Sequence, residues 1–203
     1  MTYKREENVL FFPGEIGERV LRSRLVAGED AAYRECYQQH APKLMRLLTG
    51  ILRSKARAEE VVQETFIAAF RTIATFRGEA TLSAWLARIA TNRAYNTIRD
   101  DARAKRTAPP AGDEPISQFE PCVEGRDLAR KVLAVLDNMD PPKRLALLLQ
   151  AEGYTVAEIA EISREPRGTI LARLSRSRAE LSLRMVQAGL AAEAIPASVE
   201  EKT

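Results

Sequence analysis

The side chains that most often carry nucleophilic or metal-ion chemistry are rare in this chain of 203 residues. His40 is the single histidine, and Cys36 and Cys122 are the two cysteines. One histidine and two isolated cysteines do not form the ligand cluster that a zinc ion needs. The chain also lacks a glycine-rich phosphate loop and a nucleophile placed beside a base. The sequence therefore predicts no catalytic residue, no metal site, no cofactor and no enzymatic activity.

Arginine and lysine are the chemically useful side chains that the sequence does concentrate. Residues 84–107 and residues 163–184 each carry six of them against two Asp and Glu, although the net charge of the whole chain is only +3. Residues 112–127 reverse the balance, with five acids and one base. Cationic side chains neutralise phosphates, so this distribution predicts two nucleic-acid contacts separated by a linker.

The elements that must position these cations are helices. Apolar residues make up 45% of the chain but aromatic residues only 6%, and strand-like alternation is scarce, so we expect an all-α protein of one large or two small domains. Apolar residues at alternating steps of four and three predict a helix over residues 59–76 with one buried stripe. The stripe consists of Val62, Phe66, Ala69, Ile73 and Phe76. That helix should end at Arg77-Gly78, and Thr81 or Ser83 should cap the next one. Before residue 59, two helices are expected, one over residues 29–39 and one from Pro42 to Leu52, with His40 between them at the surface.

The motifs EEVVQETF and FRGEATLSAWLARIATNRA, within residues 59–94, resemble region 2 of the sigma-70 family in its extracytoplasmic-function (ECF) subgroup. The resemblance implies a transcription initiation factor that recruits core RNA polymerase to a promoter and helps to melt it. It also implies that the outward face of the first helix binds the polymerase β′ subunit. The residues of this polymerase face are Glu60, Gln63, Glu64, Ile67 and Arg71.

In this family the loop and the helix that follow capture single-stranded bases of the −10 promoter element, one of them flipped into a pocket. Such a site needs an apolar wall for stacking, hydrogen-bonding groups for the base edge and cations for the phosphates. The matching residues are Phe76, Arg77, Gly78, Glu79, Ala80, Thr81, Trp85, Arg88, Asn92 and Arg93. Trp85, the only tryptophan, fits either core packing or a stacking role. Further phosphate contacts are expected from Arg99, Arg103, Lys105 and Arg106.

A second basic helical segment follows the acidic stretch. Thr155 and Glu158 have the spacing of a capping box, and a turn at residues 163–166 separates two short apolar patterns, which predicts a helix-turn-helix with a basic second helix. Its place after the first domain resembles sigma region 4, which reads the −35 element. The expected DNA contacts are Arg167, Thr169, Leu171, Ala172, Arg173, Ser175 and Arg176, with Arg178 equally suited to a structural role.

The expected organisation is two helical domains joined by a flexible linker. Residues 28–106 form the region 2-like domain and residues 127–185 the region 4-like helix-turn-helix domain. Proline-rich, acidic residues 107–126 form the linker, residues 186–203 a tail. Residues 1–27 are expected to be an accessory extension that packs loosely on the first domain, with a short helix from Glu15 that ends before Gly28. A deletion of residues 1–22 should therefore leave promoter-specific transcription intact.

The resemblance implies as partners the β′ and β subunits of core RNA polymerase, promoter DNA and an anti-sigma factor. The sequence has no apolar run long enough to span a membrane and no signal-peptide core, and its two cysteines are not expected to pair, so a cytoplasmic protein is expected. Two alternatives stay open on sequence alone. One is a helix-turn-helix regulator that binds duplex DNA without polymerase, and the other is a helical adaptor with solvated basic faces.

Overall fold

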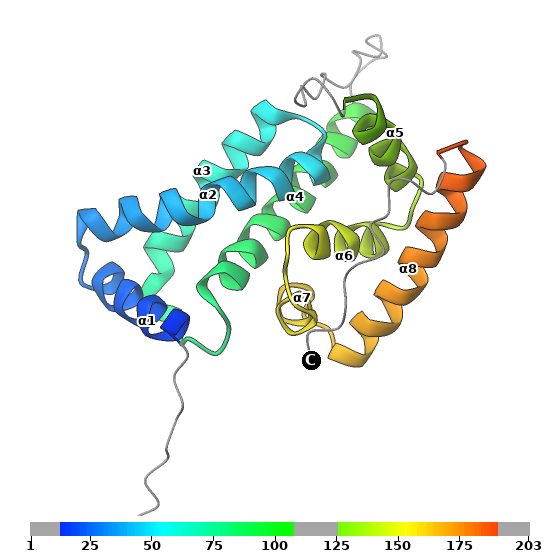
Figure 1. The fold of residues 1–203 in the computed structure, drawn as a ribbon. Coiled ribbons are helices and arrows are strands. Elements are labelled where there is room, and N and C mark those ends of the chain that lie inside the picture. Colours follow the sequence, from blue (N-terminus) through cyan, green and yellow to red (C-terminus); the bar gives the residue numbers. More distant parts are fainter. Residues whose placement is uncertain (1–12, 108–125, 191–203) are drawn as a thin grey trace, which may run out of the picture.

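The computed structural model describes residues 13–107 and 126–190, and all regular secondary structure in these two ranges is helical (Figure 1). The elements are α1 (Pro13–Val26), α2 (Asp30–Leu52), α3 (Lys55–Thr72), the 3-10 turn η1 (Ile73–Thr75), α4 (Leu82–Thr107), α5 (Arg126–Asp137), α6 (Pro141–Ala151), α7 (Val156–Ser163) and α8 (Arg167–Gln187). The expected all-α fold is confirmed. Helices α1 to α4 form one half of the molecule and α5 to α8 the other.

The first half is built on the apolar stripe that the sequence indicates for residues 59–76. All five of its members are buried, Phe66 and Phe76 included. The Ser54 hydroxyl caps α3 by accepting from the N–H of Arg57. Helices α2 and α4 pack on this stripe, so α3 holds one face in the core and presents the other to solvent. The helix ends earlier than predicted, at Thr72, and the last two members of the stripe lie in η1 (Ile73) and just after it (Phe76).

Helix α2 is one continuous helix, whereas the sequence predicts a break at Pro42. A proline inside a helix removes one backbone hydrogen bond and crowds the preceding turn. The helix continues because its apolar face is buried on both sides of the proline, with Cys36 before it and Leu44 after it. His40, predicted to be a surface residue between two helices, is therefore a half-buried residue within α2.

Helix α1 lies within the segment that the sequence assigns to a loosely packed extension. Its Leu21 and Leu25 side chains are 4% and 0% exposed and belong to the common core. The Tyr33 hydroxyl donates to the carbonyl of Leu25, which ties the end of α1 to α2. Helix α1 is therefore an integral part of the first half, not an arm beside it.

The second half contains the helix-turn-helix, formed by α7 and α8. The predicted capping box is present: the N–H of Glu158 donates to the Thr155 hydroxyl, and the N–H of Thr155 donates to the Glu158 carboxylate. Arg164 ends α7 in the left-handed conformation with φ 56°, which turns the chain into α8. Ile159, Ile170 and other apolar residues of both helices are buried between them and α6.

The two halves pack against each other through one continuous core, with α7 against α4 and α6 against α2. Arg53, at the end of α2, donates to Asp137 at 2.9 Å and to the carbonyl of Leu133 at 2.9 Å, both in α5. Arg46 pairs with Glu152 at 3.0 Å. Of the expected linker, only its two end residues lie within the described ranges. Within the described residues, every helix is too short or too polar to span a membrane.

Candidate nucleic-acid interface

The loop between η1 and α4 is a tight turn whose shape is set by Gly78 and Thr81. Gly78 has φ +78°, a conformation that residues with a side chain rarely adopt. The Thr81 hydroxyl accepts from the N–H of Ala84 at 3.1 Å, and its carbonyl accepts from the N–H of Trp85. Of the two caps that the sequence allowed, Thr81 and Ser83, Thr81 has this role, and the turn brings Phe76 back over the first turn of α4.

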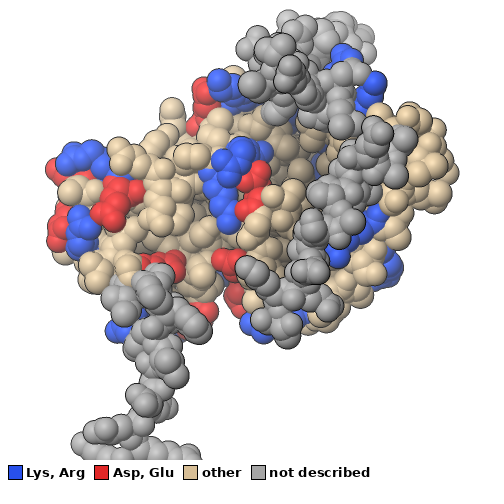
Figure 2. Space-filling view, in the orientation of Figure 1, with Lys and Arg blue, Asp and Glu red and all other residues tan. Residues whose placement is uncertain are grey.

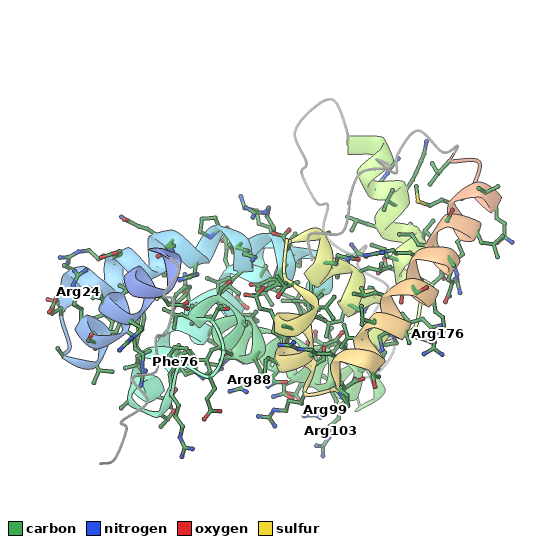
Figure 3. The ribbon with its side chains drawn as sticks, turned by 60° about the horizontal axis from the view of Figure 1, so that its bottom comes forward. Arg24, Phe76, Arg88, Arg99, Arg103 and Arg176 are labelled. Carbon is green, nitrogen blue, oxygen red and sulfur yellow. The ribbon has the colours of Figure 1, made fainter. Side chains whose placement is uncertain are left out.

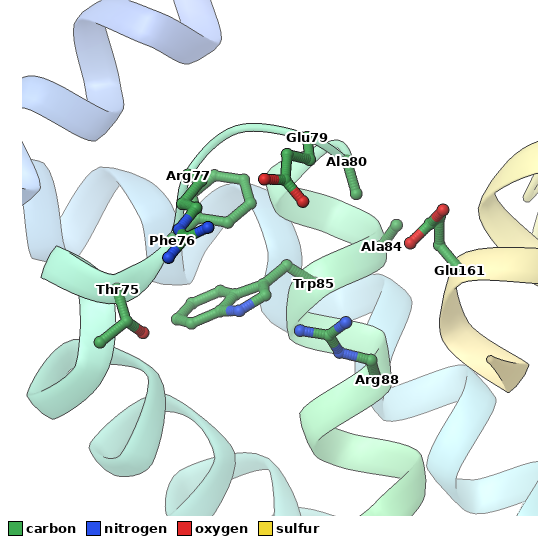
Figure 4. A pocket seen from close by; sticks show the side chains of 9 residues that line it. All are labelled: Thr75, Phe76, Arg77, Glu79, Ala80, Ala84, Trp85, Arg88 and Glu161. Atoms are coloured by element: carbon green, nitrogen blue, oxygen red, sulfur yellow. The ribbon is translucent and has the colours of Figure 1, made fainter.

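A cavity of about 240 Å³ opens between this loop and α4 (Figure 4). Its apolar wall is the pair Phe76 and Trp85, whose ring centroids lie 5.1 Å apart with the planes tilted by 33°. Both rings are largely buried, so Trp85 has the core role and lines the cavity as well. Six of the ten residues predicted for the −10 site line this cavity, namely Phe76, Arg77, Glu79, Ala80, Trp85 and Arg88.

The remaining four predicted −10 residues lie elsewhere. Gly78 and Thr81 line a larger groove of about 810 Å³ beside the cavity, between α1 and α7. Asn92 is exposed and lines a separate hollow of about 250 Å³ between α4 and α6. Arg93 is paired with Glu64 of α3 at 2.7 Å. The structure thus assembles the aromatic wall and two cationic side chains, Arg77 and Arg88, but it does not bring Asn92 to them.

Basic side chains continue along α4 beyond the cavity. Arg88, Arg99 and Arg103 project toward the same side of the molecule, and Arg176 of α8 lies toward that side as well (Figure 3). Arg99 is exposed and donates to the Asn96 side chain at 2.9 Å. The face seen in Figure 2 instead shows basic and acidic groups next to one another. The side chains of Lys105 and Arg106 lie outside the described residues.

The predicted polymerase face of α3 is exposed along its length, and its five residues are Glu60, Gln63, Glu64, Ile67 and Arg71. Ile67 is 54% exposed, an apolar side chain with a polar rim around it. The ion pair between Glu64 and Arg93 connects this face to α4. Arg93 is therefore committed to an ion pair with the α3 face.

Helix α8 exposes most of the residues predicted to read the −35 element. The exposed residues are Arg167, Thr169, Leu171, Ala172, Ser175 and Arg176. Arg173 differs, because both of its terminal nitrogens bind the Glu165 carboxylate, at 2.9 and 2.6 Å, and its side chain is only 18% exposed. Arg178 donates to Gln150 of α6 at 3.0 Å, which is the structural role.

Two acids of α7 were missed by sequence reasoning although they lie at the site. Glu161 lines the cavity opposite Trp85, and Glu158 accepts a hydrogen bond from the Thr81 hydroxyl at 2.7 Å. Burial raises the pKa of the Glu158 carboxyl, but hydrogen bonds from Thr155 and Thr81 outweigh it and hold this pKa below its ordinary value. No local pattern could reveal these contacts, because they join residues about 80 positions apart.

Comparison with known proteins decides the family. Residues 36–104 match the model of Sigma-70 region 2. The chain is 31% identical over 180 residues to the ECF RNA polymerase sigma-E factor of Haemophilus influenzae, covering 81% of this chain and 93% of that protein. The chain belongs to the ECF RNA polymerase sigma factors. This sigma factor is also 30% identical over 158 residues to SigM of Mycobacterium tuberculosis, covering 77% and 79% of the two chains.

Solved structures agree with the fold of this ECF sigma factor. Sigma factor RpoE of Bartonella quintana, solved with the anti-sigma factor NepR, superposes with a TM-score of 0.66 at 24% identity, over 76% of this chain and 96% of that one. CnrH, solved with the cytosolic domain of CnrY, gives a TM-score of 0.65 at 24% identity, over 84% and 97%. At 24% sequence identity these superpositions are evidence for the fold alone.

Proposed function

We propose that this ECF sigma factor directs core RNA polymerase to promoters, reads their −35 element with α8 and opens them by holding −10 bases at the Phe76–Trp85 cavity. The observation that carries the proposal is that cavity: two aromatic rings form a wall at the turn into α4, and Arg88 lies one helical turn further on. Drug-sized ligands need pockets of about 300–1,000 Å³, so a cavity of this size suits one small planar group.

Promoter opening then needs no catalytic group in this chain. A base that leaves the duplex loses stacking and pairing, and binding on an aromatic wall compensates for that loss. Arg88 and the arginines along the same side of α4 hold the strand by its phosphates. The chemistry of RNA synthesis belongs to the polymerase, and this chain contributes binding energy where the strands separate.

Helix α8 is suited to the major groove of duplex DNA. Its exposed face offers the cations Arg167 and Arg176 for phosphates or guanine edges, and the apolar Leu171 and Ala172 for thymine methyl groups. Because Arg173 forms an ion pair with Glu165 in the turn between α7 and α8, we assign the base contacts to the exposed residues next to Arg173.

Two protein partners complete the proposal. The α3 face, with exposed Ile67 at its centre, has the apolar middle and polar rim of a protein contact and is assigned to core polymerase. An anti-sigma factor is proposed as the regulator, because RpoE of Bartonella quintana, which has the same fold, was solved with an anti-sigma factor. The cytoplasm is the compartment in which these partners meet.

Transcription from a library of randomised promoters tests the proposal directly. Full-length chain and core polymerase should yield transcripts enriched for two conserved upstream elements. The absence of any sequence-specific transcript would contradict it. A mobility-shift assay on the recovered duplexes tests the alternative of a helix-turn-helix regulator that works without polymerase. Such a regulator would bind these duplexes tightly on its own.

A further inference from the structure

Helix α1 contacts both ends of the loop between η1 and α4, which lines the cavity. The Glu18 carboxylate accepts a hydrogen bond from the backbone N–H of Leu82, the first residue of α4. One turn further along α1, Arg22 donates to the carbonyl of Arg77 at 3.3 Å. The Arg22 guanidinium also lies 5.5 Å from the centroid of the Phe76 ring.

These contacts act on the backbone at the two ends of the loop, Arg77 and Leu82. The first N–H groups of a helix have no partner within the helix, and a carboxylate there supplies one and also interacts favourably with the helix dipole. Arg22 holds the carbonyl next to Gly78, whose positive φ makes the turn, and a Cβ built on Gly78 would lie 3.2 Å from the Arg22 side chain. A cation over an aromatic face also fixes the ring plane.

Helix α1 can serve as a fixed support because it is anchored in the core. Leu21 lies between Glu18 and Arg22 in the sequence and is 4% exposed, and Leu25 is fully buried. The same short helix thus buries one face in the first half of the molecule and directs Glu18 and Arg22 at the loop. Both of these side chains line the groove beside the cavity.

We infer that Glu18 and Arg22 are positioning residues for the proposed −10 site. They set the loop and the Phe76 ring against Trp85, so that the cavity exists before DNA arrives. The inference rests on the proposed function of this cavity. It replaces the sequence-based expectation that residues 1–22 are dispensable, because a deletion to residue 22 removes both contacts.

Trp85 allows the positioning itself to be measured, because it is the only tryptophan in the chain. In Arg22→Ala the loop should loosen, and acrylamide should quench Trp85 emission more strongly than in the wild type. Arg22→Lys keeps the positive charge over Phe76 and should restore part of the protection. Arg24→Ala is the matched control, since it removes the same charge from the same helix but breaks ion pairs with Glu29 and Glu35. Its quenching should match the wild type.

Promoter opening provides the second readout. With core polymerase and a promoter recovered from the library, permanganate reactivity of unpaired thymines should fall about fivefold in Arg22→Ala, a factor that corresponds to about 1 kcal/mol. Polymerase affinity should stay unchanged. Glu18→Ala should behave alike, and Glu18→Gln, which keeps an acceptor oxygen, should recover part of the signal.

The outcomes separate the inference from the function on which it rests. The positioning role is overturned if Arg22→Ala shows the same Trp85 quenching or the same promoter opening as the wild type. It is also overturned if Arg24→Ala is as defective as Arg22→Ala. If the wild-type holoenzyme opens no promoter, the proposed function fails. The quenching comparison then still decides whether α1 sets the cavity.

Discussion

At the scale of single residues, the polymerase face of α3 depends most on Ile67. It is the one large apolar side chain in the middle of a row of polar ones, and it is 54% exposed. Alanine scans of interfaces show that a few central residues carry most of the binding energy and that charges at the rim carry little. Glu64 is a less direct probe, because its removal also releases Arg93 from their ion pair.

We therefore predict that Ile67→Glu weakens binding to core polymerase by tenfold or more, about 1.4 kcal/mol, because it buries an unpaired charge in the contact. Val26→Glu is the control, since Val26 in α1 is 51% exposed and the substitution is of the same kind. Affinity is measured by fluorescence anisotropy with labelled chain. Equal effects of the two substitutions would show that the α3 face is not the polymerase contact.

His40 gives a prediction for pH. Burial, with a smaller contribution from Lys43, lowers the pKa of His40 to about 4, below its ordinary value of 6.5. Between these two values the unfolded chain binds a proton that the folded chain does not, so stability falls as pH decreases from 6.5 toward 4. His40→Gln should flatten the decline in melting temperature over this range. An unchanged slope in the variant would assign the decline to the carboxyl groups.

At the scale of elements, the capping box is the clearest local device. The Thr155 hydroxyl fixes the first turn of α7, and it binds the Glu158 carboxylate at 3.0 Å. Thr155→Ala should lower the free energy of unfolding by about 1 kcal/mol, and Thr155→Ser should lower it by much less, because serine also caps. Urea unfolding followed by circular dichroism checks the difference. Equal stability of the alanine variant and the wild type would show that packing alone holds α7.

The sequence predicted those elements whose signals are local. The stripe of α3, the Thr81 cap and the Thr155 capping box all follow from spacing within one or two helical turns, and all three are present. Pro42 suggested a helix break that is absent, because the burial of apolar side chains on both sides of the proline outweighs the loss of one backbone hydrogen bond. Helix α1 was predicted as a short helix, but its support of the loop joins Glu18 to Leu82 across 64 residues, which no periodicity can show.

At the scale of the whole molecule, the two halves lie closer than two linked domains require. Lys43 of α2 lies 3.5 Å from the centroid of the Tyr154 ring, and Arg53 spans to α5. Gly50 packs against Leu148 so tightly that a Cβ would come within 3.0 Å of it. The contacts bring the Glu158 and Glu161 carboxylates to the loop that is proposed to hold a polyanion.

Because like charges repel, α7 should have to leave this position when the strand binds. We predict that a reducible cross-link, made with a bis-methanethiosulfonate reagent between Thr81→Cys and Glu158→Cys in a Cys122→Ser background, prevents promoter opening and that reductant restores it. Cys36 should not interfere, since it is buried and burial raises its pKa to about 12. Each single-cysteine variant treated with the same reagent is the control. Normal opening by the cross-linked chain would show that the halves work in the arrangement seen here.

The central claim is that the cavity between the loop and α4 receives a base from the melted strand. Ala80 lines this cavity, and a phenylalanine ring in its place would fill it without removing a core side chain. Permanganate reactivity at a recovered promoter is the direct measurement, with Ala74→Phe at an exposed position as the control. We predict that Ala80→Phe binds polymerase normally but leaves the promoter closed, whereas Ala74→Phe opens it. Wild-type opening by Ala80→Phe would contradict the claim.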